Sequence, residues 1–133
     1  IVATFNDYAR SELGVVSELK YELSAGLYRD WDLGHVQPDS NGRKIPYPNV
    51  LPDLSYAMTM NPKMKVLIQQ GYYDLACPYG TVKAAVNQLN ITPELRRNVH
   101  IEYYEAGHMM YVHPESMKKF AETTNAFIDE SVR

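Results

Sequence analysis

The sequence has little of what disulfide frameworks, nucleic-acid sites and membrane spans are built from. One cysteine in 133 residues excludes a disulfide within the chain. The net charge is −3 and no basic cluster exceeds two neighbours, so the chain offers no electrostatic footprint for nucleic acid. It contains no apolar run long enough to span a membrane. We therefore expect neither a nucleic-acid nor a membrane partner, and nothing in the sequence points to a cofactor.

The residue types that are abundant indicate a folded chain with half-buried surfaces. Hydrophobic side chains make up 45% of the sequence, which favours a packed domain over a disordered chain. The 11 tyrosines combine an apolar ring with a polar tip. Such side chains suit a substrate cleft, or a face that packs on another part of a larger protein.

Two short apolar runs predict a pair of parallel strands. Met64–Gln70 and Val99–Tyr104 are too brief for packed helices and are rich in strand-favouring side chains. Between them, Tyr79–Asn90 has apolar residues at helical spacing, namely Val82, Ala85, Val86 and Leu89. A strand, a helix and a second strand form a right-handed crossover, which places the two strands side by side with their carboxyl ends together. The predicted fold class is therefore α/β.

Each predicted strand runs into a loop that carries a candidate catalytic residue. Asp74 follows the first strand, and His108 follows the second strand 34 positions later. Open α/β sheets place ligands and catalytic groups at the carboxyl ends of their strands. Taken alone, Asp74 is a common turn residue and His108 a common loop residue. Together, at matching strand ends, they predict the acid and the base of an acid–histidine–nucleophile triad.

The other segments are predicted to be helices around one loop. Thr4–Tyr28 has the spacing of one long helix with Asn6 as its N-cap, and the alternative is two helices divided near Gly14, which weakens the middle. Its apolar face would include Leu13, Val16, Leu19 and Leu23. Proline, glycine and short polar residues predict a loop over 31–48.

The second half of the chain should add three more helical segments. Asn49–Met60 is a predicted helix that ends at Asn61-Pro62, and Thr92–Arg97 is a single turn capped by Thr92. Pro114–Val132 is a terminal amphipathic helix. Its predicted apolar face consists of Met117, Phe120, Ala121, Thr124, Phe127 and Ile128.

Three stretches carry a resemblance to a known family. They are Val66-Leu67-Ile68, Gly71-Tyr72-Tyr73-Asp74-Leu75-Ala76-Cys77-Pro78 and Tyr104-Glu105-Ala106-Gly107-His108-Met109-Met110-Tyr111. With these residues the chain resembles the C-terminal part of the serine carboxypeptidases, which have the α/β-hydrolase fold. More weakly, Leu54-Ser55-Tyr56-Ala57-Met58 with Asn61-Pro62 is similar to the helix before the acid-bearing strand in bacterial-type members.

The resemblance implies roles for particular residues. Asp74 would be the triad acid and His108 the triad base, while Cys77 and Met109 would border the substrate pocket. Residues 1–48 would be the end of a cap-like helical insertion with its loop, and residues 49–133 the C-terminal part of the hydrolase core. The implied reaction is hydrolysis of C-terminal peptide bonds, and the implied location is secreted or periplasmic.

One feature of that family is missing. The nucleophile elbow is Gly-x-Ser-x-Gly or a close variant, and no serine of this sequence has a glycine two positions before it. The serines are Ser11, Ser17, Ser24, Ser40, Ser55, Ser116 and Ser131. We therefore interpret the chain as a C-terminal fragment that is inactive alone. The alternatives are a fragment of another α/β-hydrolase, such as an esterase or acyltransferase, and a non-catalytic binding or scaffold chain.

Other chemistry is less well supported by the sequence. His108 and His113 are five positions apart without a His-Glu-x-x-His pattern, so no metal site is predicted. Cys77 lies on the same loop as Asp74, whose carboxylate charge opposes thiolate formation. It is therefore predicted to line a pocket and not to act as a nucleophile.

The strand Met64–Gln70 would have an unpaired edge. We therefore expect the chain to associate with the missing part of its parent or with a second copy of itself.

Overall fold

The computed structural model describes residues 2–22, 24 and 26–132. The chain mixes helices with two small sheets, one of them antiparallel and one parallel. It forms two compact units, Ile1–Leu33 and Gly34–Arg133. The division expected from the family resemblance, after residue 48, stays a prediction, because compactness does not test the origin of a segment.

The first unit shows that the prediction of one long helix is wrong. Helix α1 covers Val2–Ser11, and the next helical segment is a single 3-10 turn, η1, over Leu27–Arg29. Gly14 has a φ of 65°, a left-handed conformation that ends helical propagation. The side chains predicted to form an apolar face beyond the end of α1 are exposed, with Leu13 at 59%, Val16 at 98% and Leu19 at 82%. The position of Leu23 lies outside the described residues.

Asn6 does not cap this helix. It lies inside α1, where its side-chain amide donates a hydrogen bond to the carbonyl of Val2 at 2.9 Å. The sequence pattern had placed the start of the helix too late, because α1 already begins at Val2.

A small hairpin lies within the segment predicted as a loop. Strands β1 (His35–Val36) and β2 (Lys44–Ile45) pair in antiparallel fashion. Asn41 and Gly42 adopt positive φ in the turn between them, which is the backbone geometry that such turns require. Nε2 of His35 lies 2.7 Å from Oδ2 of Asp53, so the hairpin is tied to helix α2 (Leu51–Met60). His35 therefore has a carboxylate partner on that helix.

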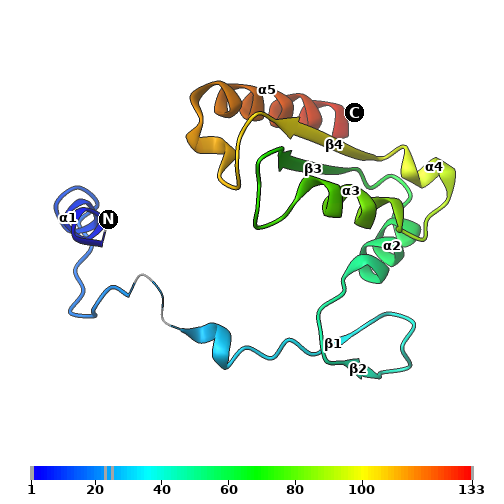
Figure 1. The fold of residues 1–133 in the computed structure, drawn as a ribbon, viewed down its shortest axis with the longest axis horizontal. Helices are drawn as coiled ribbons and strands as arrows, with labels where there is room; N and C mark the ends of the chain where they lie inside the picture. Colours follow the sequence, from blue (N-terminus) through cyan, green and yellow to red (C-terminus); the bar gives the residue numbers. More distant parts are fainter. Residues whose placement is uncertain (1, 23, 25, 133) are drawn as a thin grey trace. The chain divides into compact units, whose positions relative to one another are not determined.

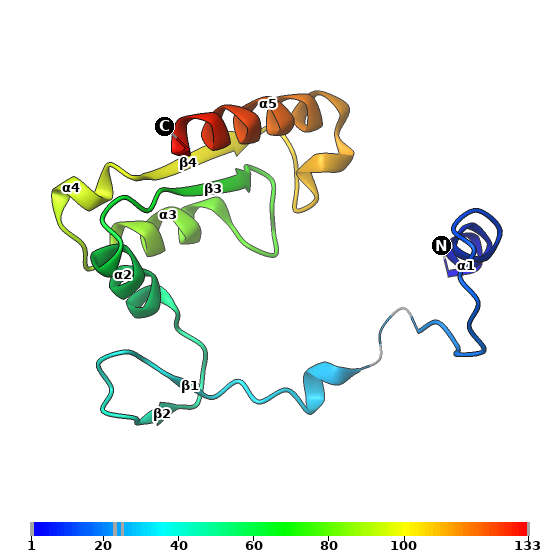
Figure 2. The ribbon, with the colours of Figure 1, turned by 180° about the vertical axis from the view of Figure 1, so that it is seen from behind.

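The parallel strands are confirmed. Strand β3 covers Val66–Gly71 and strand β4 covers Val99–Tyr104. Their register runs from Val66 opposite Val99 to Gly71 opposite Tyr104, so both strands end at the same level. In Figures 1 and 2 helix α3 lies on one side of this sheet and helix α5 on the other.

Helix α3 (Tyr79–Asn87) makes the crossover between the two strands. Its predicted apolar face is confirmed, because Val82, Ala85 and Val86 are partly buried and Leu89, just after the helix, is 3% exposed. Thr92 caps the next short helix, α4 (Pro93–Arg96), as predicted, by accepting a hydrogen bond from the N–H of Leu95. The chain then enters β4 directly.

Helix α5 (Pro114–Ser131) covers the other face of the sheet through part of its predicted apolar stripe. Phe120 packs near the ring of Tyr104, and Phe127 packs near His100. Met117 and Ile128 were predicted to be buried, but they are 57% and 51% exposed. The two-stranded sheet is too narrow to cover the full width of this stripe.

No helix in the described part of the chain is both long and apolar enough to cross a membrane. The best-buried apolar residues of the second unit are Met58, Leu89, Leu95, Tyr104 and Ala106. They lie along the sheet and the helices next to it, so the core supports the loops that leave the carboxyl ends of β3 and β4.

Candidate functional site

Two loops leave the carboxyl ends of β3 and β4 in close contact. The N–H of Tyr73 donates to the carbonyl of Ala106 at 3.0 Å. A Cβ added to Gly71 would lie 2.4 Å from the carbonyl oxygen of Gly107 and 2.5 Å from that of Ala106. Only glycine permits this approach, because any other side chain would displace the second loop. The strand ends and Gly71 therefore fix how the loops meet.

Asp74 is held firmly within the first of these loops. Its Oδ1 accepts hydrogen bonds from the N–H groups of Ala76 and Cys77, both at 2.8 Å, and the residue is 5% exposed. An aspartate commonly closes a turn on its own backbone in this way. Here the same bonds orient the carboxylate, so the turn role and the proposed catalytic role are compatible.

The pKa of the Asp74 carboxyl lies below its ordinary value. The main causes are the hydrogen bond from the N–H of Cys77 and the bond to the ring of His108, which both favour the ionised form. Partial burial works in the opposite direction but does not prevail. Asp74 is therefore a carboxylate near neutral pH.

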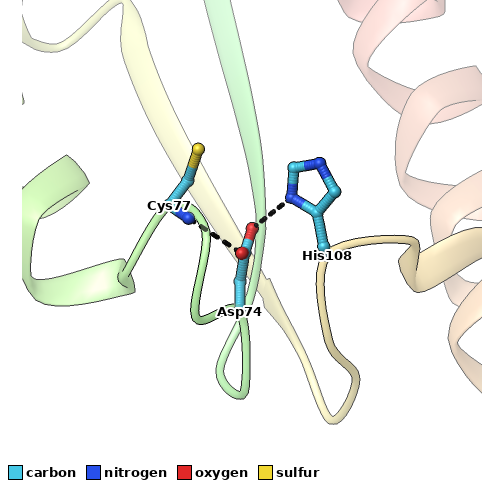
Figure 3. A group of neighbouring side chains, drawn as sticks. All are labelled: Asp74, Cys77 and His108. Atoms are coloured by element: carbon cyan, nitrogen blue, oxygen red, sulfur yellow. Dashed lines mark hydrogen bonds and ion pairs between the residues drawn. The ribbon is translucent and has the colours of Figure 1, made fainter. Parts of the chain in front are cut away.

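The structure confirms that Asp74 and His108 meet. Nδ1 of His108 lies 2.9 Å from Oδ2 of Asp74, and Figure 3 shows the carboxylate between Cys77 and the imidazole. An ionised carboxylate can only accept hydrogen bonds, so Nδ1 carries the proton of this contact. In the neutral ring Nε2 is then left with a free lone pair. The His108 side chain is 64% exposed, so that lone pair is available to a group that approaches it.

Gln70 contacts the Asp74 carboxylate, and the sequence analysis missed it. Its side chain is buried, and Nε2 donates to the carbonyl of Cys77 at 2.7 Å and contacts Oδ2 of Asp74 at 3.4 Å. A glutamine near the end of an otherwise apolar strand was the available signal. Because a buried amide needs partners, its presence there indicated a polar network at the strand end.

A second contact ties the two loops together on their exposed side. The hydroxyl of Tyr73 donates a short hydrogen bond to Oε2 of Glu105. This bond and the negative charge of Glu105 raise the pKa of Tyr73. Tyr73 directly precedes Asp74, and Glu105 is three residues before His108. The Tyr73–Glu105 contact therefore links the two loops close to Asp74 and His108, and it was also missed from the sequence.

Cys77 and Met109 lie near Asp74 and His108, on exposed parts of the same two loops. Cys77 is an exposed free thiol, and Met109 is 53% exposed. The cavity of about 450 Å³ beside β4 is lined by other residues, including Tyr72, Tyr103 and Lys119. The pocket role of Cys77 and Met109 therefore stays a prediction.

The two histidines considered for a metal site do not act together. His113 caps helix α5, because its Nδ1 accepts from the N–H of Ser116 at 3.3 Å and lies 2.8 Å from the Ser116 hydroxyl. A different group of possible ligands is brought together instead. Ligand atoms of Asp74, Cys77 and His108 all lie within 4.8 Å of one another.

No hydroxyl in the described residues hydrogen-bonds to His108. Four serine hydroxyls, those of Ser11, Ser40, Ser55 and Ser131, donate to backbone carbonyls three or four residues earlier. Ser116 belongs to the cap of α5. In the described part of the chain, the contact between Asp74 and His108 thus has the Cys77 thiol near it but no serine hydroxyl bonded to the ring.

Comparison with known proteins does not assign a function, so a proposal must depend on the geometry of the site. No protein-family model, curated protein or solved structure gives a significant match to the chain.

Proposed function

We propose that this chain supplies the acid and base of a serine-type hydrolase that resembles the serine carboxypeptidases. Asp74 is the acid and His108 is the base. The observation that carries the proposal is the 2.9 Å contact between Nδ1 of His108 and the held carboxylate of Asp74, with the opposite ring nitrogen exposed. The parallel β3–α3–β4 crossover supports an α/β-hydrolase core, since that arrangement brings the two loops together.

In this mechanism each group performs a defined proton transfer. Nε2 of His108 takes the proton of a nucleophilic hydroxyl as that hydroxyl attacks the substrate carbonyl. The carboxylate of Asp74 holds the ring and stabilises the imidazolium. The imidazolium then gives the proton to the leaving amine, and an acyl-enzyme remains until water releases it. The nucleophile and the donors that stabilise the oxyanion come from residues outside this sequence.

The substrate in this proposal is a peptide from which C-terminal residues are removed. Cys77 and Met109 lie beside the acid and the base and would border the bound peptide. No cofactor takes part, because the carboxylate, the imidazole and a hydroxyl are sufficient for acyl transfer.

The sheet edges support association with further chain. Among the described residues, β3 and β4 pair only with each other. Unpaired strand edges bind additional strands readily. We propose that the rest of the parent protein or a second copy of this chain covers an edge. Light scattering at micromolar concentration would measure the mass, and a monomer with a cooperative melt would contradict this proposal.

The protonation state of His108 is the first test and needs only this chain. Nitrogen-15 spectra of the histidine rings should show His108 as the tautomer with hydrogen on Nδ1 in its neutral form. In Asp74→Asn this preference should be lost, because the amide can also donate to the ring. A neutral His108 with its hydrogen on Nε2 in the unchanged chain would contradict the role of base.

Turnover is the second test and needs the complete encoded polypeptide. We expect His108→Ala to abolish release of C-terminal amino acids. Asp74→Asn should lower kcat by about 10⁴-fold, as the same replacement of the triad aspartate does in a serine protease. His100→Gln, an exposed histidine on β4, is the matched control and should leave turnover unchanged. Release of alcohols from esters but not of amino acids from peptides would instead indicate an esterase.

The isolated chain should not react with a serine-directed fluorophosphonate. Its mass should remain unchanged after incubation, because no hydroxyl is activated by His108 in the described residues. Stoichiometric labelling of any serine would show that the nucleophile lies within the chain and has been misplaced.

A further inference from the structure

We propose that Asp74, Cys77 and His108 form a binding site for a thiophilic divalent cation, with Zn²⁺ as the best fit. Their ligand atoms lie within 4.8 Å of one another, at the point where the two loops meet (Figure 3). The sequence spacing did not suggest this site, because Asp74 and Cys77 lie on one loop and His108 on another, 34 residues from Asp74.

The three donors fit zinc better than the other common cations. Zinc is bound in proteins by cysteine sulfur, histidine nitrogen and carboxylate oxygen in tetrahedral geometry. Magnesium and calcium take oxygen ligands, so a thiol and an imidazole disfavour both of them. Three protein ligands leave the fourth tetrahedral position for water. The site is therefore of the open kind.

Only small movements are needed to bring the ligands to a metal. Zinc bonds of about 2.0–2.3 Å place neighbouring ligand atoms roughly 3.3–3.8 Å apart. A separation of 4.8 Å must then close by about 1.0–1.5 Å, and the 2.9 Å contact between His108 and Asp74 must open slightly. Cys77 and His108 are exposed and have room to rotate, whereas Asp74 is fixed by its backbone hydrogen bonds. In the closed arrangement the cation replaces the proton between Nδ1 of His108 and Oδ2 of Asp74, the ring takes up a proton on Nε2 instead, and the Cys77 thiol releases its proton to solvent.

Metal binding would switch off the base, and this consequence rests on the proposed function. A neutral ring that binds the cation through Nδ1 carries its hydrogen on Nε2. It can no longer accept the proton of a nucleophile. A complete hydrolase would then be inhibited reversibly by Zn²⁺ and recovered by a chelator. Binding of the cation itself depends only on the three side chains.

Titration of the reduced chain with Co²⁺ tests the site directly. Tetrahedral Co²⁺ absorbs in the visible range, and a thiolate ligand adds a charge-transfer band in the near ultraviolet. Because the sequence has one cysteine, this band reports Cys77 alone. Competition with Zn²⁺ then gives the zinc affinity. We expect one cation per chain, with both absorption features present.

Two variants and a control decide the ligand set. Cys77→Ser should abolish the charge-transfer band, and both Cys77→Ser and His108→Ala should weaken Zn²⁺ binding by at least about tenfold. Both positions are exposed, so the variants should still fold, which circular dichroism would check. His100→Gln should bind as the unchanged chain does.

Three results would overturn the proposal. They are the absence of saturable binding, binding that Cys77→Ser or His108→Ala leaves intact, and one cation shared by two chains. None of them bears on the proposed hydrolase function, which is judged by the His108 tautomer and by turnover in metal-free buffer. Conversely, a chain that binds zinc but fails those tests would retain the metal site without the hydrolase role.

Discussion

The loops that carry Asp74 and His108 differ in how firmly they hold these two side chains. Asp74 is 5% exposed and accepts from two backbone N–H groups of its own loop. The His108 side chain is 64% exposed, and its polar contact in the described residues is with Asp74. The Asp74 carboxylate is thus part of the scaffold, while the His108 ring is oriented by that carboxylate. A site of this kind can be completed by groups that approach the base from outside.

The largest effect should come from the point where the two loops touch. Gly71→Ala would place a Cβ about 2.4 Å from a backbone oxygen of the second loop. We expect a loss of about 3 kcal/mol in the free energy of unfolding, because backbone must move to relieve the clash. Urea denaturation measures it. Gly80→Ala is the matched control, since nothing lies within 4 Å of its added Cβ, and it should be neutral or stabilising.

Removing the Asp74 side chain should destabilise the chain more than removing the His108 side chain. Asp74→Ala leaves the N–H groups of Ala76 and Cys77 without their acceptor, so we expect a loss of about 2 kcal/mol in the free energy of unfolding. His108→Ala removes one exposed contact and should cost about 1 kcal/mol or less. Equal losses from the two variants would show that both loops hold their side chains equally firmly.

Acid titration should isolate the contribution of the Asp74 carboxylate. Its pKa in the folded chain lies below the ordinary value of 3.8, so its stabilisation is complete above that value and is lost as pH falls through the folded pKa. The difference in unfolding free energy between the unchanged chain and Asp74→Asn should therefore be constant from neutral pH to about pH 5 and shrink below about pH 4. A difference that grows on acidification would contradict a lowered pKa.

The smallest effect on stability should follow modification of Cys77. Because the thiol is exposed, alkylation with iodoacetamide should proceed to completion and move the melting temperature by less than about 3 °C. In a complete hydrolase the same modification should raise KM for bulky substrates while kcat changes little. An unchanged KM after full modification would place the thiol away from the bound substrate.

The sheet and the contact between Asp74 and His108 could be predicted because strong local patterns determine them. Short apolar runs separated by a helical pattern have one common arrangement, and the carboxyl ends of parallel strands meet at one edge. The proximity of Asp74 and His108 follows from that topology. The contacts of Gln70 and the Tyr73–Glu105 bond depend on side-chain geometry within the loops, which spacing does not encode.

The prediction of one long helix over Thr4–Tyr28 failed because its apolar side chains are not packed. Residues after Ser11 keep helical spacing of apolar side chains, but Gly14 turns the backbone left-handed and Val16 is 98% exposed. Helices of this length derive most of their stability from packing, so periodicity alone did not suffice. The hairpin at His35–Val36 and Lys44–Ile45 was missed because strands of two residues leave no periodic signal.

The register of β3 and β4 also governs when the site can form during folding. Val66 pairs with Val99, so the sheet closes only after the whole crossover between them has been gathered. Pairing between such distant positions is slow compared with the formation of a helix or a turn. The Asx turn of Asp74 is local and can form early, whereas its contact with His108 must wait for strand pairing. A nascent or partly unfolded chain therefore carries Asp74 and His108 on separate segments, and the two side chains meet only when the strands pair.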